Sequence, residues 1–254
     1  MNFINKYKSA NFNFRKKGHK IKYIILHYTA IKSDYEAIQH LIDKQNKVSS
    51  HFLINKKGKI FSLVDLRKRA WHAGQSFWKG DKDINSNSIG IELDNTGHYI
   101  NFEKYTKNQI DSLVKLLSFL KKKYDISNLN FLGHSDISPY RKNDPGEKFP
   151  WKKLSKYNLG FFPIKLTERE YVKVKKKLNL NLNLNKNKSL NQSVLYMLSN
   201  IGYDISHIEK NNRKNFFLLI RAYQMHFRQK LVNGKLDKET LKLIVSHFNQ
   251  TLTI

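Results

Sequence analysis

The 254-residue sequence contains no cysteine, no long apolar run and few acidic residues. Without cysteine there are no disulfides, iron–sulfur clusters or thiolate metal sites, so any metal must be held by His, Asp or Glu. No stretch approaches the ~20 apolar residues of a membrane-spanning helix. The basic N-terminal stretch MNFINKYKSANFNFRKKGHK lacks the apolar segment of a secretory signal peptide. We therefore expect no integral membrane segment.

The 20 acidic residues are outnumbered by 47 basic ones, which gives a formal net charge of +27. Such a charge suits a polyanionic partner, either a nucleic acid or a bacterial envelope. The lysines are spread along the whole chain and no module that reads nucleic acid is recognisable, so we expect no nucleic-acid partner. The hydrophobic fraction of 40% is enough for a folded core, in one large domain or two smaller ones.

Strand-like and helix-like patterns alternate over the first 165 residues. Helical spacing covers residues 34–45 and 106–124, and Thr106 and Gln109 have the spacing of a capping box. The strand-like runs are YIILH (23–27), SSHFLINKKGKIFSLVD (49–65, a hairpin), SIGIELDN (88–95) and LNFLGH (129–134). This alternation predicts an α/β domain over residues 1–165, with a central sheet flanked by helices.

The remaining sequence predicts a linker and a second, smaller domain. The stretch KVKKKLNLNLNLNKNK (173–188) is of low complexity, so we interpret residues 166–188 as a linker. Helical patterns near 190–200, 214–229 and 238–248 then predict a small all-α domain of three helices over residues 189–254.

Three of the predicted strands end in residues that can bind metal or transfer protons: His27, Glu92 and His134. In open α/β sheets, ligands bind beyond the carboxyl ends of the strands, where such side chains converge. The loop that follows His134 adds Asp144, whose backbone is held extended because Pro145 comes next. Two imidazoles and one carboxylate, His27, His134 and Asp144, are the ligand set of a catalytic zinc with one open position.

The same ligand types also occur in iron oxygenases with two histidines and one carboxylate, and His134 and Asp136 have the H-x-D spacing of those enzymes. Such enzymes usually combine an all-β barrel with a second histidine far downstream. Here strands alternate with helices, and the downstream histidines lie in the predicted helical domain. We therefore favour zinc.

The segments ILHYTA, SSHFLI, AWHAG, SIGIELDN and GHSDISPYRKNDPG lie in this order between residues 25 and 146. Their order and spacing resemble those of the type-2 N-acetylmuramoyl-L-alanine amidases, zinc enzymes of peptidoglycan. The AWHAG and FWKG segments and the C-terminal helices resemble the envelope members of this family. FFLLIRAYQMHFR (216–228) followed by GKLDKETLKLI (234–244) is similar to a peptidoglycan-binding domain.

The resemblance implies a role for each residue of the strand-end set. It gives His27, His134 and Asp144 as the ligands of one zinc ion per chain. Glu92 matches the family's general base, and Lys142 matches the cation that stabilises the oxyanion of the tetrahedral intermediate.

Other residues are expected near this site. His72, Trp71 and Trp78 are candidate contacts to the muropeptide, and the tryptophans are alternatively core residues. His51 is either a hydrogen-bond partner behind the ligands or a core histidine. Asp136 is expected to cap its own loop rather than bind metal, since short Asx hydrogen bonds are typical of such positions.

These observations predict a zinc amidase that hydrolyses the amide bond between N-acetylmuramic acid and L-alanine in peptidoglycan or muropeptides. Two alternatives remain: a cytoplasmic amidase that recycles soluble anhydromuropeptides, and a non-catalytic peptidoglycan-binding protein. The likeness to envelope members favours the periplasm or secretion. The absence of a visible signal peptide favours the cytoplasm. The sequence does not predict an oligomeric state.

Overall fold

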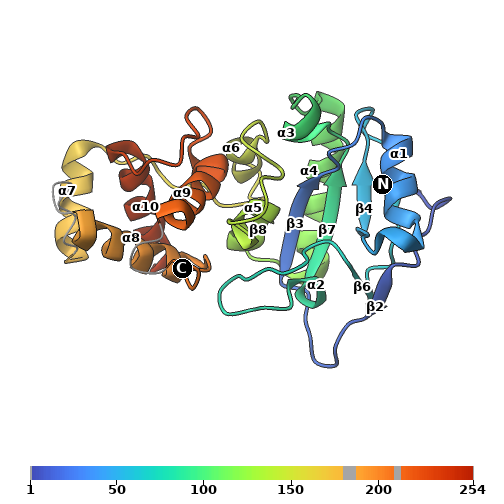
Figure 1. Cartoon of the computed structure of the whole chain (residues 1–254), viewed down its shortest axis with the longest axis horizontal. Coiled ribbons are helices and arrows are strands. Elements are labelled where there is room, and N and C mark those ends of the chain that lie inside the picture. The colour runs from blue at the N-terminus through green and yellow to red at the C-terminus, as the bar shows by residue number, and fades with distance from the viewer. Residues whose placement is uncertain (1, 180–186, 209–212, 254) are drawn as a thin grey trace.

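The computed structural model describes residues 2–179, 187–208 and 213–253 (Figure 1). In this part of the chain six strands form one mixed sheet. Their order is β1 (Phe3–Ile4), β5 (Ile60–Ser62), β4 (Phe52–Ile54), β7 (Ser88–Leu93), β3 (Tyr23–Tyr28) and β8 (Phe131–Gly133). Strands β4, β7, β3 and β8 are parallel, whereas β1 and β5 run in the opposite direction. The predicted α/β fold with a central sheet is confirmed.

Smaller elements complete the part of the chain around the sheet. Strands β2 (Phe12–Phe14) and β6 (Lys68–Ala70) form a separate antiparallel ribbon. The helices are α1 (Asp34–Ile42), α2 (Ile84–Asn87), α3 (Gly97–Ile100), α4 (Lys107–Tyr124), α5 (His134–Ile137) and α6 (Trp151–Ser155). Two 3₁₀ turns, Lys44–Asn46 and Asn128–Asn130, lie between them.

One face of the sheet is apolar and is covered by α4. Side chains alternate between the two faces of a strand, so every second residue of β3 and β7 points to this side. These residues and the buried face of α4 form one cluster: Ile24, Leu26, Ile89, Ile91, Leu93, Ile110, Leu113, Leu116, Leu117 and Leu120. This packing fixes β3 and β7, the two strands that carry His27 and Glu92.

The start of α4 departs from the predicted capping box. The Thr106 hydroxyl accepts a hydrogen bond from the Gln109 backbone N–H (3.1 Å), as expected. The Gln109 side chain does not return to Thr106, because its amide donates to the carbonyl oxygens of Ile54 (2.9 Å) and Asp94 (3.1 Å). Gln109 therefore attaches the helix to the ends of β4 and β7.

The opposite face of the sheet is covered from two sides. Helix α1 packs over β4 and β5 through a small apolar cluster: Ala37, Ile38, Leu41, Leu53, Phe61 and Leu63. The β3–β8 side is covered by three C-terminal helices, α8 (Asn187–Ile201), α9 (Arg213–Phe227) and α10 (Lys238–Thr251). The three predicted helices are thus present, and we call α8, α9 and α10 the helical group.

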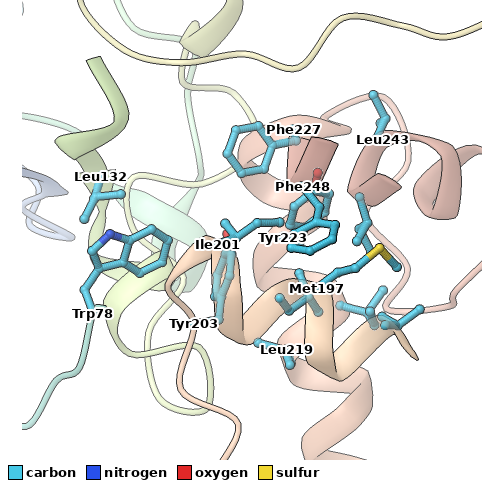
Figure 2. Packing of buried hydrophobic residues seen from close by; sticks show 14 of the residues in the cluster. Trp78, Leu132, Met197, Ile201, Tyr203, Leu219, Tyr223, Phe227, Leu243 and Phe248 are labelled. Atoms are coloured by element: carbon cyan, nitrogen blue, oxygen red, sulfur yellow. The ribbon is translucent and has the colours of Figure 1, made fainter. Parts of the chain in front are cut away.

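The helical group and the sheet share one continuous apolar cluster (Figure 2). Trp78, with Leu132 beside it, packs against Tyr203, which follows α8, and the ring centroids of Trp78 and Tyr203 are 4.9 Å apart. Gly202 has φ +141°, and a Cβ atom there would lie 2.6 Å from Trp78, so this contact requires glycine. The division into domains at 1–165 and 189–254 stays a prediction.

A helix occupies part of the predicted linker over 166–188. Residues Glu168–Lys177 form α7, and Thr167 and Glu170 make a reciprocal capping box at its start. Glu168 pairs with Lys238 (3.1 Å) and Lys242 (2.6 Å) of α10. The composition bias concealed this helix, because Lys-rich helical turns and Lys-rich linkers look alike. Residues 180–186 of the predicted linker lie outside the described residues.

Across the described ranges, no helix combines the length and apolarity needed to span a bilayer.

Candidate active site

The register of the parallel strands brings the predicted strand-end residues together. His27 of β3 lies directly opposite Glu92 of β7, and Leu26 lies opposite Gly133 of β8. His134 follows Gly133 as the first residue of α5, so it is adjacent to His27. All three side chains are buried, with exposed fractions of 2% for His27, 9% for Glu92 and 4% for His134.

The loop after α5 returns Asp144 to these strand ends. Its carbonyl accepts the Ser135 backbone N–H (2.9 Å), and its peptide bond to Pro145 is cis. Asp136 caps α5, because its Oδ2 accepts the Gly133 backbone N–H at 2.7 Å. The predicted capping role of Asp136 is therefore confirmed.

Three ligand atoms converge at one point. His27 Nδ1 lies 2.8 Å from Asp144 Oδ2 and 3.0 Å from His134 Nδ1. His134 Nδ1 lies 3.0 Å from Asp144 Oδ2. Together these residues form a buried His–His–Asp set that can hold a metal ion.

The second nitrogen of each imidazole is already committed as a donor. His134 Nε2 faces the Ala73 carbonyl oxygen at 3.0 Å, so it carries the proton and leaves a lone pair on Nδ1. For His27, a chain of bonds gives the same result. The Ser88 hydroxyl donates to the Ile84 carbonyl oxygen (2.6 Å) and therefore accepts from His72 Nε2 (3.1 Å). His72 Nδ1 is then an acceptor for His27 Nε2–H (3.1 Å).

This order of protons explains why the set fits a cation. Two imidazole lone pairs and one carboxylate oxygen face each other within hydrogen-bond distance, an arrangement that repels itself unless a positive charge lies among them. Neutral imidazoles and an ionised carboxylate are the states that bind metal. Burial lowers the pKa of His27 to about 4 and so keeps it neutral.

Gly90 makes room for His72 behind the metal set. A Cβ atom at position 90 would lie 2.3 Å from His72 Cγ, so any side chain there would displace the ring. The glycine in SIGIE therefore serves the hydrogen-bond chain to His27.

Glu92 is a buried carboxyl group beside the three converging ligand atoms. Its Oε2 is buried and has no hydrogen-bond partner among the described residues. Burial, and next the Asp144 carboxylate, raise the pKa of Glu92 to about 8, while Lys142 opposes the rise. A positive charge bound at the neighbouring set would lower this pKa toward neutrality, where a general base is most effective.

A pocket of about 240 Å³ opens over the metal set. His27, Glu92, His134 and Asp144 line it, together with Lys142 and Asn143 of the loop that precedes Asp144. A more apolar part of the lining comes largely from α1 and its flanking segments: Ala30, Ile31, Ala37, His40, Leu41 and Val48. Three residues that could hold a metal, the buried Glu92 carboxyl group and the Lys142 side chain thus line one cavity, which has room for a small part of a substrate.

The other predicted site residues lie elsewhere. Trp78 is 3% exposed and packs in the cluster shared with the helical group, so the expected substrate contact is wrong and its core alternative is right. Trp71 is not among the residues that line the pocket, and its indole N–H donates to Asn13 of the β2 strand at 2.5 Å.

The two further histidines lie behind the ligands. His72 lines the pocket, but both of its ring nitrogens are engaged by His27 and Ser88, which leaves neither for a muropeptide. His51 accepts the Gly90 N–H (3.0 Å) and faces the Lys68 carbonyl (3.1 Å), and therefore has the contacts of a core histidine.

Two residues at the pocket were not predicted. Arg141 donates to the carbonyl oxygens of Ala73 (3.0 Å) and Gln75 (2.7 Å) and so joins the loop to the AWHAG segment. Tyr99 lines the pocket and is 82% exposed. The sequence signal for Arg141 was its position next to Lys142, whereas an isolated tyrosine such as Tyr99 carries no signal of its own.

Comparison with known proteins agrees with this geometry. The family model for N-acetylmuramoyl-L-alanine amidase matches residues 17–147. The amidase AmiD of Escherichia coli is 35% identical over 235 residues, which cover 87% of this chain and 80% of AmiD. The 1,6-anhydro-N-acetylmuramyl-L-alanine amidase AmpD of Haemophilus influenzae is 32% identical and covers 57% of this chain and 86% of its own.

Solved structures give the same result over nearly the whole chain. E. coli AmiD in complex with anhydro-N-acetylmuramic acid-L-Ala-D-γ-Glu-L-Lys superposes with a TM-score of 0.77 at 31% identity and covers 94% of this chain and 93% of its own. AmpDh3 of Pseudomonas aeruginosa with anhydromuramic pentapeptide has a TM-score of 0.78 at 28% identity, covering 97% of each chain. The chain belongs to the N-acetylmuramoyl-L-alanine amidase family and is an enzyme of that class, a hydrolase of an amide bond.

Proposed function

We propose that this amidase is zinc-dependent and that His27, His134 and Asp144 hold one zinc ion per chain. Two neutral nitrogens and one carboxylate oxygen are typical of catalytic zinc sites, and the three atoms lie within 4.8 Å of one another. When bound, zinc lowers the pKa of water toward ~7 and polarises a carbonyl group. His72 and the Ala73 carbonyl hold the two imidazoles in the tautomers that bind it.

In this proposal Glu92 is the general base. Its unpartnered Oε2 accepts a proton from the attacking water and returns it to the leaving nitrogen of L-alanine. Lys142, which lines the pocket two residues before Asp144, stabilises the negative charge that develops on the carbonyl oxygen. The substrate is the amide between N-acetylmuramic acid and L-alanine.

The physiological substrate is, in our proposal, the wall polymer in the bacterial envelope. The net charge of +27 attracts polyanionic surfaces, and the helical group provides a further surface for holding the polymer. Soluble anhydromuropeptides in the cytoplasm are the alternative, since bound ligands of AmiD and AmpDh3 are anhydromuramic peptides. Mass analysis of products from sacculi and from soluble anhydromuropeptides, together with cell fractionation, distinguishes the two.

The observation that carries the proposal is the buried, unpartnered Glu92 carboxylate beside a set of three converging ligand atoms. Glu92→Gln keeps the size and shape of the side chain but removes its ability to accept a proton. We expect zinc content and thermal unfolding to match the parent, while turnover of muropeptides falls about 10²–10⁴-fold.

Glu36→Gln is the matched control, because Glu36 is an exposed carboxylate on α1 and should leave turnover unchanged. Loss of zinc from Glu92→Gln would make Glu92 a ligand, and turnover within a few-fold of the parent would remove it from the mechanism.

A further inference from the structure

One loop, residues 134–149, carries His134, Lys142 and Asp144, and we call it the catalytic loop. It contains the four-residue helix α5 and otherwise turns and irregular backbone, so no strand pairing holds it in place. Instead, contacts to the helical group and to the residues that flank its helices hold much of the loop in place. They occur at Asp136, Tyr140, Asn143, Glu147 and Phe149, along the whole length of the loop.

At the start of the catalytic loop, Asp136 is anchored to the helical group. Its Oδ1 accepts the Tyr203 hydroxyl at 2.7 Å, and its Oδ2 lies 2.7 Å from His226 Nδ1 on α9. Asp136 is 1% exposed and His226 is 3% exposed, and the His226 ring stacks on Trp151 with centroids 3.8 Å apart. The carboxylate that caps α5, two residues after His134, is therefore held from the other side by α9.

In the middle of the loop, the contact lies between the two residues with proposed catalytic roles. Arg221 Nη1 of α9 donates to Asn143 Oδ1 at 2.7 Å, and Asn143 is the residue between Lys142 and Asp144. Before it, the Tyr140 hydroxyl donates to the Asp204 carbonyl oxygen at 2.6 Å. After it, the Gln229 amide donates to the Glu147 carbonyl oxygen at 2.8 Å and also to that of Phe149.

We propose that the helical group is a positioning part of the active site, in which Arg221 and His226 fix the catalytic loop so that Lys142 and Asp144 face the metal set. This inference rests on the proposed roles of Lys142 and Asp144. The helical group is suited to this task because its own helices share a continuous apolar cluster with the sheet, which makes it a rigid support. A displacement of about 1 Å at reacting groups can cost ~10²-fold in rate, so a single contact beside Lys142 and Asp144 matters.

The test uses the full chain and substitutions that leave the metal ligands unchanged. Arg221→Ala removes the contact to Asn143 and should lower kcat on a soluble muropeptide by about 3- to 100-fold, with KM within about twofold of the parent. The thermal midpoint should stay within about 4 °C, because only one partly exposed hydrogen bond is lost.

Arg228→Ala is the matched control. Arg228 lies just beyond the end of α9, and its side chain contacts Asp237, Glu239 and Thr240, which all belong to α10 or its N-cap. This variant should lose as much stability as Arg221→Ala or more, while kcat stays close to that of the parent. A fall in kcat equal to that of Arg221→Ala would mean that general loosening of the helices, and not the loop contact, causes the effect.

A double-mutant cycle and hydrogen exchange complete the test. The double variant Arg221→Ala/Asn143→Ala should have a kcat no lower than that of the slower single variant, since both substitutions remove the same hydrogen bond. If the falls in kcat of the two single variants multiply in the double variant, the proposal is overturned. Amides of residues 134–149 should exchange faster in Arg221→Ala and not in Arg228→Ala. Exchange does not depend on turnover, so an inactive parent would count against the proposed function, and unchanged exchange would count against the positioning role.

Discussion

Two buried carboxylates of the catalytic loop, Asp144 and Asp136, meet histidines at nearly the same distance but serve different purposes. Asp144 Oδ2 lies 2.8 Å from His27 Nδ1, and Asp136 Oδ2 lies 2.7 Å from His226 Nδ1. Around Asp136, donors surround the acceptor oxygens: the Gly133 N–H, the Tyr203 hydroxyl and the His226 ring nitrogen. Around Asp144, both histidines have their protons engaged elsewhere, so lone pairs meet.

The difference lies in where the protons are, not in the types of residue. A carboxylate with matching donors is a structural hydrogen-bond centre, whereas converging lone pairs at a pocket are a metal site. The second nitrogens of the histidines therefore distinguish the two clusters. Those of His134 and His27 donate to the Ala73 carbonyl and to His72, whereas His226 Nε2 has no hydrogen-bond partner among the described residues, which leaves the proton on Nδ1 for Asp136.

The largest expected effect comes from breaking the metal cluster. Asp144→Ala leaves two histidines as ligands and should lose both bound zinc and activity, by about 10³-fold or more, because the metal supplies several kcal/mol of transition-state stabilisation. Metal content after gel filtration and turnover of muropeptides measure both effects. Asp136→Asn is the control and should retain zinc; full zinc occupancy in Asp144→Ala would instead point to another third ligand.

Breaking the structural cluster removes no metal ligand, so its largest effect should be on stability. Asp136→Ala leaves the Tyr203 hydroxyl, the Gly133 N–H and the His226 N–H without their acceptor inside the protein. The free energy of unfolding should fall by about 3–5 kcal/mol, because the partners of a removed buried charge stay buried and unpaired. Denaturant unfolding measures the loss. A change below about 1 kcal/mol would show that this cluster contributes little to the junction between loop and helices.

A smaller and more gradual loss of stability is expected when the pH of the metal-free protein is lowered. Burial lowers the pKa of His27 to about 4, that of His51 to about 3 and that of His72 well below its ordinary value. These rings stay neutral when folded but bind protons when unfolded below pH ~6.5, so acid favours unfolding.

Stability should therefore be retained above pH ~6.5 and fall as the pH drops toward 4, by about 1.4 kcal/mol per pH unit for each such histidine. Zinc should oppose this fall, since it binds neutral His27. Thermal unfolding midpoints that stay constant between pH 7 and 4.5 would contradict the assignment of these rings as buried and neutral.

Most of the sheet could be predicted because its signals are local. The runs that became β3, β7 and β8 are short, apolar and bounded by polar residues, and α4 shows regular helical spacing. Local signals do not reveal which faces are covered, however. Trp78 was ambiguous because a tryptophan in a binding wall and one in a core have the same sequence context, and Tyr203 and Gly202, which bury it, are far away in the chain.

The part of the site that lies at the ends of the parallel strands could be predicted from the sequence. Parallel pairing places His27, Glu92 and His134 side by side, which alternation of strands and helices already suggests. The role of His72 was not predictable, since it depends on a bond to Ser88 sixteen positions away and on the space left by Gly90. Similarly, no local pattern links Arg221 to Asn143, which are 78 positions apart.

The apolar cluster shared by β3, β8 and the last helices also affects how the chain matures. Tyr23 and Ile25, near the start, are in one cluster with Ile244 and Phe248, near the end. A ribosome adds about 5–20 residues per second, so β3 waits roughly 10 to 45 seconds for its last covering residues to be made. During that interval Leu132 and Trp78 are exposed to other chains and to chaperones, and contacts between such distant residues form slowly. Completion of the active enzyme therefore requires that α10 has been synthesised.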